Sequence, residues 1–187
     1  MILLSAVGVG LLIGIGKARW QGQIYRLPPL KFFWLVALAY LPQLLLLALT
    51  RKQVVVPVET AGIMLVISLG MLMVFVWLNR HLPGMPILLG GLIMNLAVIA
   101  ANGGLMPISP QTASQLVSGE ARPALEPGGR FGEKDVLLPE QEMRLEFLSD
   151  RYLLPAWFPY KAAFSLGDAL VGAGALWFLV ANQREER

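Results

Sequence analysis

The chain has 187 residues, of which 56% are apolar and 14% are charged, and its formal net charge at pH 7 is +3. Soluble domains usually contain about 25% charged residues, so this composition indicates membrane-spanning segments. The chain has no cysteine and one histidine, which excludes thiolate and histidine-cluster metal sites within it, and we expect neither a metal nor a cofactor. The basic residues fall beside apolar runs, where they set membrane orientation, so the positive charge does not indicate a nucleic-acid partner.

Five long apolar runs predict an all-α fold, a polytopic membrane helix bundle that forms a single domain. The predicted transmembrane helices cover residues 2–16, 32–49, 61–78, 86–101 and 162–181. The first run is followed by basic residues, Lys17 and Arg19, whereas a signal peptide carries its positive charges in front of the apolar stretch. We therefore expect a first helix that is retained.

The loop between the first two predicted helices determines the expected orientation. It carries four basic residues and no acid: Lys17, Arg19, Arg26 and Lys31. Short loops of this kind lie in the cytoplasm, so we expect the N-terminus and the long loop 102–161 outside, and the tail 184–187 inside. The Arg51-Lys52 pair, in a loop expected outside, is the one feature that opposes this orientation.

The long outer loop, residues 102–161, is expected to contain local structure. Ser109-Pro110 is typical of a helix start, because serine caps free N–H groups and proline lacks one, and this helix would end near Gly119. Gly128-Gly129 predicts a turn. Residues 139–148 have the apolar spacing of an amphipathic helix.

The acidic residues of the outer loop, including Glu133 and Asp135, are expected to form a solvated surface. Their spacing does not match the pattern of a calcium-binding loop.

Asp168 is the only acidic residue inside a predicted span. An ionisable group there is costly and usually faces a partner or a water-filled cavity. Asn95 on the fourth span lies at the same depth, about 10 Å below the outer end at 1.5 Å per residue, and small or polar residues share its face. We predict that Asn95 and Asp168 lie within hydrogen-bonding distance.

Two interpretations of this polar pair remain open. In the first, an outward-facing pocket has Asp168 at its base and Asn102, Asp150 and Ser165 at its mouth, and it binds a ligand. In the second, Asn95 and a protonated Asp168 form an interhelical hydrogen bond that only fixes packing.

The segment Asn102-Gly103-Gly104 follows the fourth span directly and also allows two interpretations. Successive glycines let backbone N–H groups approach a ligand, so Gly103 and Gly104 are candidate ligand-binding residues beside Asn102. The same residues suit a left-handed helix stop followed by a turn.

Three blocks of the sequence resemble a family of small bacterial membrane proteins that is catalogued only as a domain of unknown function. They are Asn102-Gly103-Gly104-Leu105-Met106-Pro107, Leu148-Ser149-Asp150 and Ser165-Leu166-Gly167-Asp168. The resemblance covers most of the chain. It implies a multi-pass protein of the bacterial cytoplasmic membrane and supplies no activity.

The C-terminal third is also similar to lipoprotein signal peptidase, an aspartic peptidase of the bacterial inner membrane. Asp150 and Asp168 match its two catalytic aspartates in order, spacing and predicted side of the membrane. The resemblance implies that one carboxylate takes a proton from water while the protonated one donates to the substrate carbonyl. Ser165-Leu166-Gly167-Asp168 stands where that family has Asn-x-Ala-Asp, and its Asn-x-x-Asp-Arg block has no clear counterpart.

The sequence thus leaves two functions, both with membrane lipids as neighbours. The first is a bundle that binds a lipid, small ligand or partner subunit through the polar pocket, including the case of an accessory subunit of a membrane complex. In this bundle Asp150 and Asp168 are not expected to converge. The alternative is an aspartic-type peptidase acting on a membrane protein, which requires that they do. A transporter is not favoured, because no pair of spans shows inverted-repeat symmetry.

Overall fold

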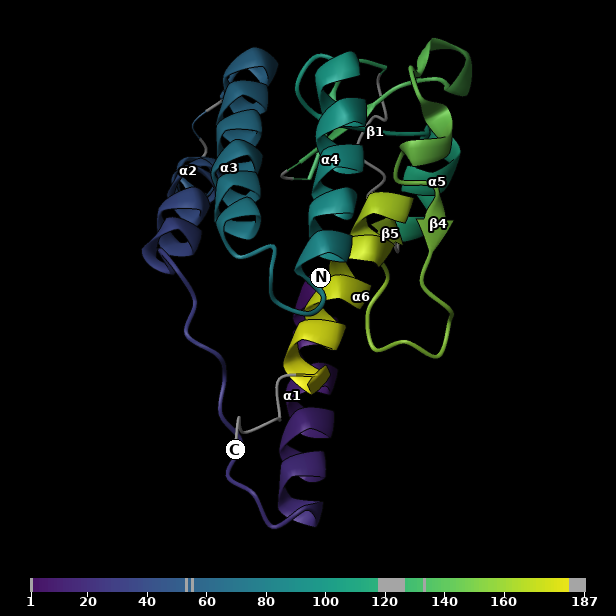
Figure 1. Ribbon diagram of the computed structural model, residues 1–187. Helices are drawn as coiled ribbons and strands as arrows, with labels where there is room; N and C mark the ends of the chain where they lie inside the picture. The colour runs from purple at the N-terminus through teal and green to yellow at the C-terminus, as the bar shows by residue number, and fades with distance from the viewer. Residues whose placement is uncertain (1, 53, 55, 118–126, 133, 182–187) are drawn as a thin grey trace.

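The computed structural model describes residues 2–52, 54, 56–117, 127–132 and 134–181, and this part of the chain is mostly helical (Figure 1). Its α-helices are α1 (Ile2–Trp20), α2 (Trp34–Arg51), α3 (Val58–Leu78), α4 (Met85–Ala101), α5 (Pro110–Leu116) and α6 (Leu166–Ala181). Each of the five predicted spans therefore overlaps a helix, although α6 begins at Leu166 and not at the predicted residue 162, because Ala163–Phe164 forms a short strand. Within the described residues, α1, α2 and α3 are long and apolar enough to cross a membrane, whereas α4 and α6 are apolar but shorter.

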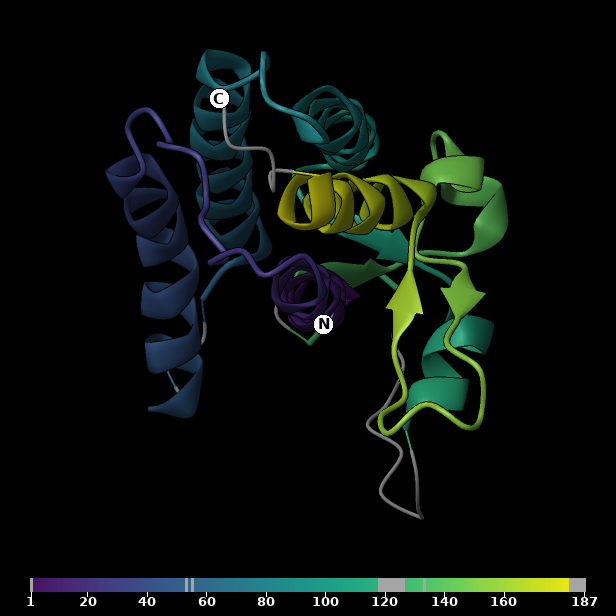
Figure 2. The ribbon, with the colours of Figure 1, turned by 60° about the horizontal axis from the view of Figure 1, so that its bottom comes forward.

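The large helices pack in the spatial order α2, α3, α4, α6, α1, so that the first helix contacts the last (Figure 2). Tyr25, just after α1, donates a 3.0 Å hydrogen bond to the carbonyl of Leu179 near the end of α6. The hydroxyls of Ser5 and Tyr160 lie 2.6 Å apart, which holds the start of α1 beside the loop that precedes α6. The first and last of the described helices thus pack against each other.

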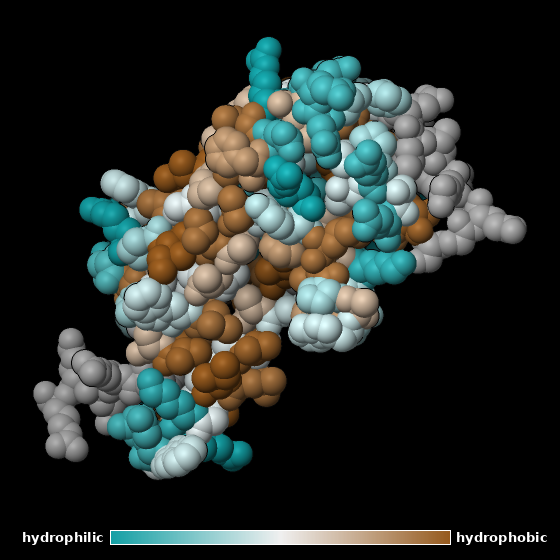
Figure 3. Space-filling view, turned by 90° about the vertical axis from the view of Figure 1, so that its right-hand side faces the viewer, coloured by the Kyte–Doolittle hydropathy of each residue, from teal (hydrophilic) through white to brown (hydrophobic). Residues whose placement is uncertain are grey.

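The outer surface of the helices carries many exposed apolar side chains, as expected for contact with lipid. Leu12 and Ile63 are among the most exposed. Figure 3 shows apolar residues across the middle of one face and polar residues gathered toward both ends. Inside the bundle, Leu65, Leu92 and other buried side chains form one hydrophobic core.

Two small sheets in the segment before α6 correct the all-α expectation. Strand β3 (Asp135–Leu137) pairs in parallel with β1 (Met106–Ile108) and antiparallel with β2 (Arg130–Phe131), and β4 (Tyr152–Leu153) pairs antiparallel with β5 (Ala163–Phe164). These strands have two or three residues each, too few for the alternation that reveals a strand in a sequence.

The prediction of an amphipathic helix at residues 139–148 is wrong. The chain forms two separate 3-10 turns there, η1 (Glu140–Glu142) and η2 (Glu146–Leu148). Leu145 lies between them with φ of 55°, a left-handed conformation that a right-handed helix cannot contain.

Other predictions for the outer loop are confirmed. Ser109 caps α5, because its hydroxyl accepts a 3.1 Å hydrogen bond from the N–H of Thr112. Gly128 lies in a turn with φ of 80°. The helix expected to end near Gly119 ends at Leu116. Gly119 itself and the predicted inner tail 184–187 lie outside the described residues.

Candidate functional site

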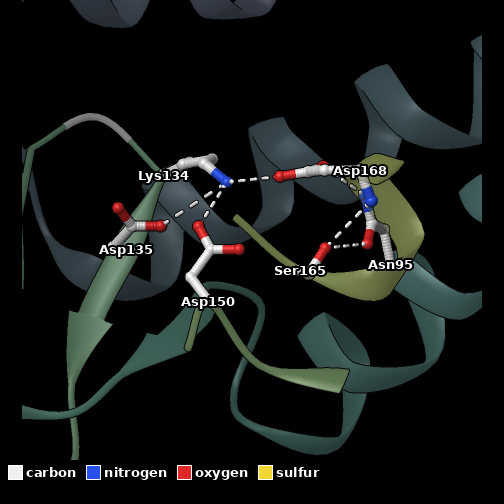
Figure 4. Close-up of polar contacts among 6 residues, drawn as sticks. All are labelled: Asn95, Lys134, Asp135, Asp150, Ser165 and Asp168. Atoms are coloured by element: carbon white, nitrogen blue, oxygen red, sulfur yellow. Dashed lines mark hydrogen bonds and ion pairs between the residues drawn. The ribbon is translucent and has the colours of Figure 1, made fainter. Parts of the chain in front are cut away.

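Asn95 and Asp168 form a direct hydrogen bond between α4 and α6, as predicted. The Asn95 Nδ2 donates to Asp168 Oδ1 at 2.7 Å, and the Ser165 hydroxyl donates to Asn95 Oδ1 at 2.9 Å. The Ser165 Oγ also accepts from the N–H of Asp168 at 3.0 Å, so that it fixes both partners. Figure 4 shows the three side chains converging at the start of α6.

Glycines allow the two helices to approach closely enough for this hydrogen bond. A Cβ atom on Gly91 would lie 2.5 Å from the carbonyl oxygen of Gly167 and 2.7 Å from the backbone nitrogen of Val171. A Cβ on Gly167 would overlap the side-chain amide of Asn95. Only residues without a side chain fit at these two positions.

Lys134 joins three carboxylates, two from the outer segment and one from α6, an arrangement that the sequence does not predict (Figure 4). Its Nζ lies 2.6 Å from Asp150 Oδ2, 3.4 Å from Asp168 Oδ2 and 3.9 Å from Asp135 Oδ1. Lys134 and Asp135 are placed by strand β3, and Asp150 follows η2. Asp150 and Asp168 therefore converge, but on an ammonium group that stands between them.

The cluster is buried on one side and accessible on the other. The side chain of Asp150 is 1% exposed, whereas those of Asp168 and Lys134 are 26% and 40% exposed. Asp135 is intermediate, at 14%. A ligand could thus contact Asp168 and Lys134 directly, while Asp150 supports Lys134 from beneath.

Burial also changes the protonation of the cluster. It raises the pKa of the Asp135 carboxyl to about 7 and raises that of Asp150, although the Lys134 ammonium acts in the opposite direction on both. Burial lowers the pKa of Lys134, but the three carboxylates outweigh it, so the net direction is upward and the amine stays charged. Because Lys134 lies much closer to Asp150 than to Asp135, a proton held by the two carboxyls resides on Asp135.

A cavity of about 870 Å³ lies next to this cluster. Its polar lining consists of Asn95, Lys134, Asp135 and Asp168, together with Tyr40 and Gln43 of α2. The other walls are largely apolar and come from α1, α2, α3, α4 and β1; they include Leu3, Leu4, Val7, Leu46, Met64, Leu65, Leu69, Ile99 and Met106. The cavity therefore combines a few charged and polar side chains with a largely apolar lining.

The remaining candidate residues do not line this cavity among the residues that the structure describes. Asn102 ends α4, and its side chain binds the backbone of Arg144 in both directions, at 2.7 and 2.9 Å. Gly103 and Gly104 have φ of 80° and 98°, and Gly104 packs against Gly62, where a Cβ would lie 2.9 Å away. The structure places this segment as a helix stop and a packing contact, apart from Asp168.

Lys134 and Asp135 are the residues of the candidate site that the sequence did not indicate. Asp135 was expected on a solvated surface, and it is instead mostly buried beside the cavity. The one available signal was its position next to the apolar pair Val136-Leu137, which are both buried. The neighbouring Glu133 lies outside the described residues.

Comparison with known proteins gives one match. A model described as a family of unknown function, DUF5317, matches residues 28–180. The chain belongs to this family. All six residues drawn in Figure 4 lie within the match, whereas α1, which contributes part of the cavity wall, precedes it. No curated protein and no solved structure matches the chain, so the similarity to lipoprotein signal peptidase stays a prediction.

Proposed function

We propose that this chain is a multi-pass protein of the bacterial cytoplasmic membrane that binds a lipid-like amphiphile in the cavity beside Lys134. The observation that carries the proposal is the composition of the cavity, with charged and amide groups at one side and leucine, valine and methionine elsewhere. Its volume of about 870 Å³ is that of a ligand pocket, which usually encloses about 300–1,000 Å³. A membrane supplies amphiphiles at high local concentration.

In this proposal the apolar walls provide the affinity for the amphiphile, and the polar side chains determine its orientation in the cavity. Burying a ligand's hydrocarbon chain stabilises the complex by about 25 cal/mol per Å² of apolar surface. Met64 and Met106 in the wall suit chains of varied shape, because methionine is flexible and polarisable. Asn95, Asp168 and Lys134 would then hold the polar head at the end of the cavity.

The proposed orientation has the N-terminus and the 102–161 segment outside and the C-terminus inside. Two contacts support it by grouping the loops that would share a side. The backbone N–H and C=O of Lys31 bind the side chain of Asn79 at 2.8 and 3.0 Å, which joins the two loops expected inside. The Ser5–Tyr160 contact joins the two segments expected outside.

Helices α4 and α6 complete the five proposed spans. They have 17 and 16 residues and are therefore about 25 Å long at 1.5 Å per residue, somewhat shorter than a hydrocarbon core of about 30 Å. Polar segments continue from their outer ends, and local thinning of the bilayer accommodates a mismatch of this size.

An aspartic-type membrane peptidase is the second candidate, favoured by the convergence of Asp150 and Asp168 on one nitrogen. Aspartic dyads share a proton directly between two carboxyls, whereas here an ammonium group lies between them. Asp150 is also 1% exposed, which leaves no access for a substrate. A cell lacking its own lipoprotein signal peptidase tests this function: restored cleavage by the well-expressed chain would establish it, and no cleavage would eliminate it.

The binding proposal is tested by photo-crosslinking in phosphatidylcholine nanodiscs that contain a trace of a phospholipid with a diazirine in its acyl chain. We expect cross-links to peptides of α1 and α3 that form the cavity wall. Replacing Leu3 and Leu4 together by tryptophan narrows the cavity and should reduce this labelling. The matched control replaces Leu12 and Ile13, which are on the same helix and equally exposed (74% and 47%, against 70% and 45% for Leu4 and Leu3) but are not among the cavity residues. Labelling that responds equally to both double variants would overturn the proposal.

A further inference from the structure

The polar side of the cavity has more negative than positive charge. Three carboxyl groups, those of Asp135, Asp150 and Asp168, surround the one ammonium of Lys134. Even with a proton on Asp135, the cluster carries a net charge of −1. The other described polar residues that line the cavity, Asn95, Tyr40 and Gln43, add no positive charge.

The cluster also has more hydrogen-bond acceptors than donors. Asp150 Oδ1 is buried without a hydrogen-bond partner among the described residues, and Figure 4 shows it pointing toward the side of Ser165. Buried acceptors without a donor are costly. Asp150 is 1% exposed and is not among the cavity residues, so a ligand in the cavity does not reach this oxygen. A ligand that brings positive charge would instead reduce the net negative charge of the cluster, whereas an anionic group would increase it.

Lys134 lies at different distances from the three carboxylates and therefore neutralises their charge unequally. Its 2.6 Å contact with Asp150 is a short charge-assisted hydrogen bond, whereas the 3.4 Å and 3.9 Å separations from Asp168 and Asp135 are loose. Asp168 and Asp135 are also the two acids that line the cavity. The uncompensated negative charge therefore faces the cavity interior.

We propose that the amphiphile bound in this cavity carries a protonated primary amine at its head, and that the ammonium binds between Asp168 and Asp135 beside Lys134. This inference rests on the proposed function and specifies its ligand class. With the ligand in place, three carboxyls face two cations and one proton, so the cluster becomes neutral. A fatty acid or an anionic lipid head would place like charges against Asp168.

The test compares three single-chain probes that share one diazirine-bearing alkyl chain and differ only in the head: a primary amine, a carboxylic acid and an alcohol. Each is added to the full-length protein in phosphatidylcholine nanodiscs at pH 7, and cross-linked wall peptides of α1 and α3 are quantified. A charge-assisted hydrogen bond contributes about 1.5–3 kcal/mol, so the amine should label the wall at least about tenfold more strongly than either other probe. Because this comparison uses the unmodified chain, it does not depend on any variant folding.

The variant Asp168→Asn tests whether the Asp168 carboxylate causes the preference for the amine probe. It should lower labelling by the amine about tenfold and leave labelling by the alcohol unchanged, while Glu59→Gln, at an exposed acid in the first turn of α3, should change neither. Equal labelling by all three probes, preference for the acid, or an amine signal insensitive to Asp168→Asn would overturn the ammonium inference and leave the lipid-binding proposal standing. If no probe labels the wall above the level of the outer helix faces, both proposals fail.

Discussion

Lys134 and Asp150 form an ion pair of 2.6 Å in which the carboxylate is almost completely buried and the lysine is partly exposed. The pair joins the start of strand β3 to the segment after η2, and through Asp168 it also reaches the start of α6. It thus ties the outer segment to the helix bundle at the wall of the cavity.

Lys134→Met should destabilise the protein by about 3 kcal/mol, because it leaves the Asp150 carboxylate buried without a counter-ion. The additional change Asp150→Asn should recover much of this loss, since an uncharged amide is less costly to bury. Thermal unfolding in detergent measures both effects, with Lys52→Met, at an exposed position after α2, as the control. Full additivity of the Lys134 and Asp150 substitutions would show that the two groups do not interact.

Two adjacent glycines of α4 should respond in opposite ways to alanine. Gly91→Ala should cost more than about 2 kcal/mol and weaken the Asn95–Asp168 contact, because its Cβ would meet the backbone of α6. Gly90→Ala should be neutral or stabilising by up to about 1 kcal/mol, since nothing lies within 4 Å of a Cβ there. Chemical denaturation of both variants measures the difference, and similar effects at the two positions would contradict the close helix approach.

Asp168→Asn should leave the fold largely intact, within about 1 kcal/mol of the parent chain. The amide oxygen can still accept from Asn95, so the interhelical hydrogen bond survives. Asp168→Leu removes the acceptor and leaves the buried Asn95 donor unpaired, which should cost about 1–3 kcal/mol. Unfolding midpoints of the purified variants distinguish this outcome from a general intolerance of any change at position 168.

The raised pKa of Asp135 predicts a specific dependence of stability on pH. The folded state holds this proton up to about pH 7, whereas the unfolded carboxyl loses it near pH 4. The folded chain therefore binds more protons between these values, and the Asp135 contribution to stability falls as pH rises from about 4 to 7. Asp135→Asn should remove this slope, so the variant should gain stability relative to the parent chain as pH increases. If the difference in unfolding free energy between the variant and the parent chain were constant from pH 4 to pH 8, it would contradict a raised pKa for Asp135.

The proposed topology is testable with single cysteines, because the chain contains none. A cysteine at Gln111 in α5 should react with a membrane-impermeant maleimide in intact cells. One at Gln23, after α1, should react only after the membrane is opened. Both positions are exposed in the structure, so a reversed labelling pattern would establish the opposite orientation.

The sequence predicts contacts within and between regular helices better than contacts made by the outer segment. Asn95 and Asp168 could be paired because helical periodicity and depth place them on facing surfaces. The positions of Lys134 and Asp135 could not be predicted, because the parallel pairing of β3 with β1 brings them to the site. These three-residue strands have no distinctive sequence pattern. The left-handed Leu145 likewise has no signal in its side chain, which led to the wrong helix at 139–148.

The packing of α1 against α6 has a consequence for how the protein is made. Ribosomes add about 5–20 residues per second, so α1 leaves the ribosome many seconds before α6 exists to receive it. During that interval Gly10 and Gly14, which contact α6 in the finished bundle, lie against lipid or against whatever insertion factor accompanies the nascent chain. The contact between α1 and α6 therefore forms only after α6 has been made, and a chain truncated before α6 would present an unfinished bundle to membrane proteases.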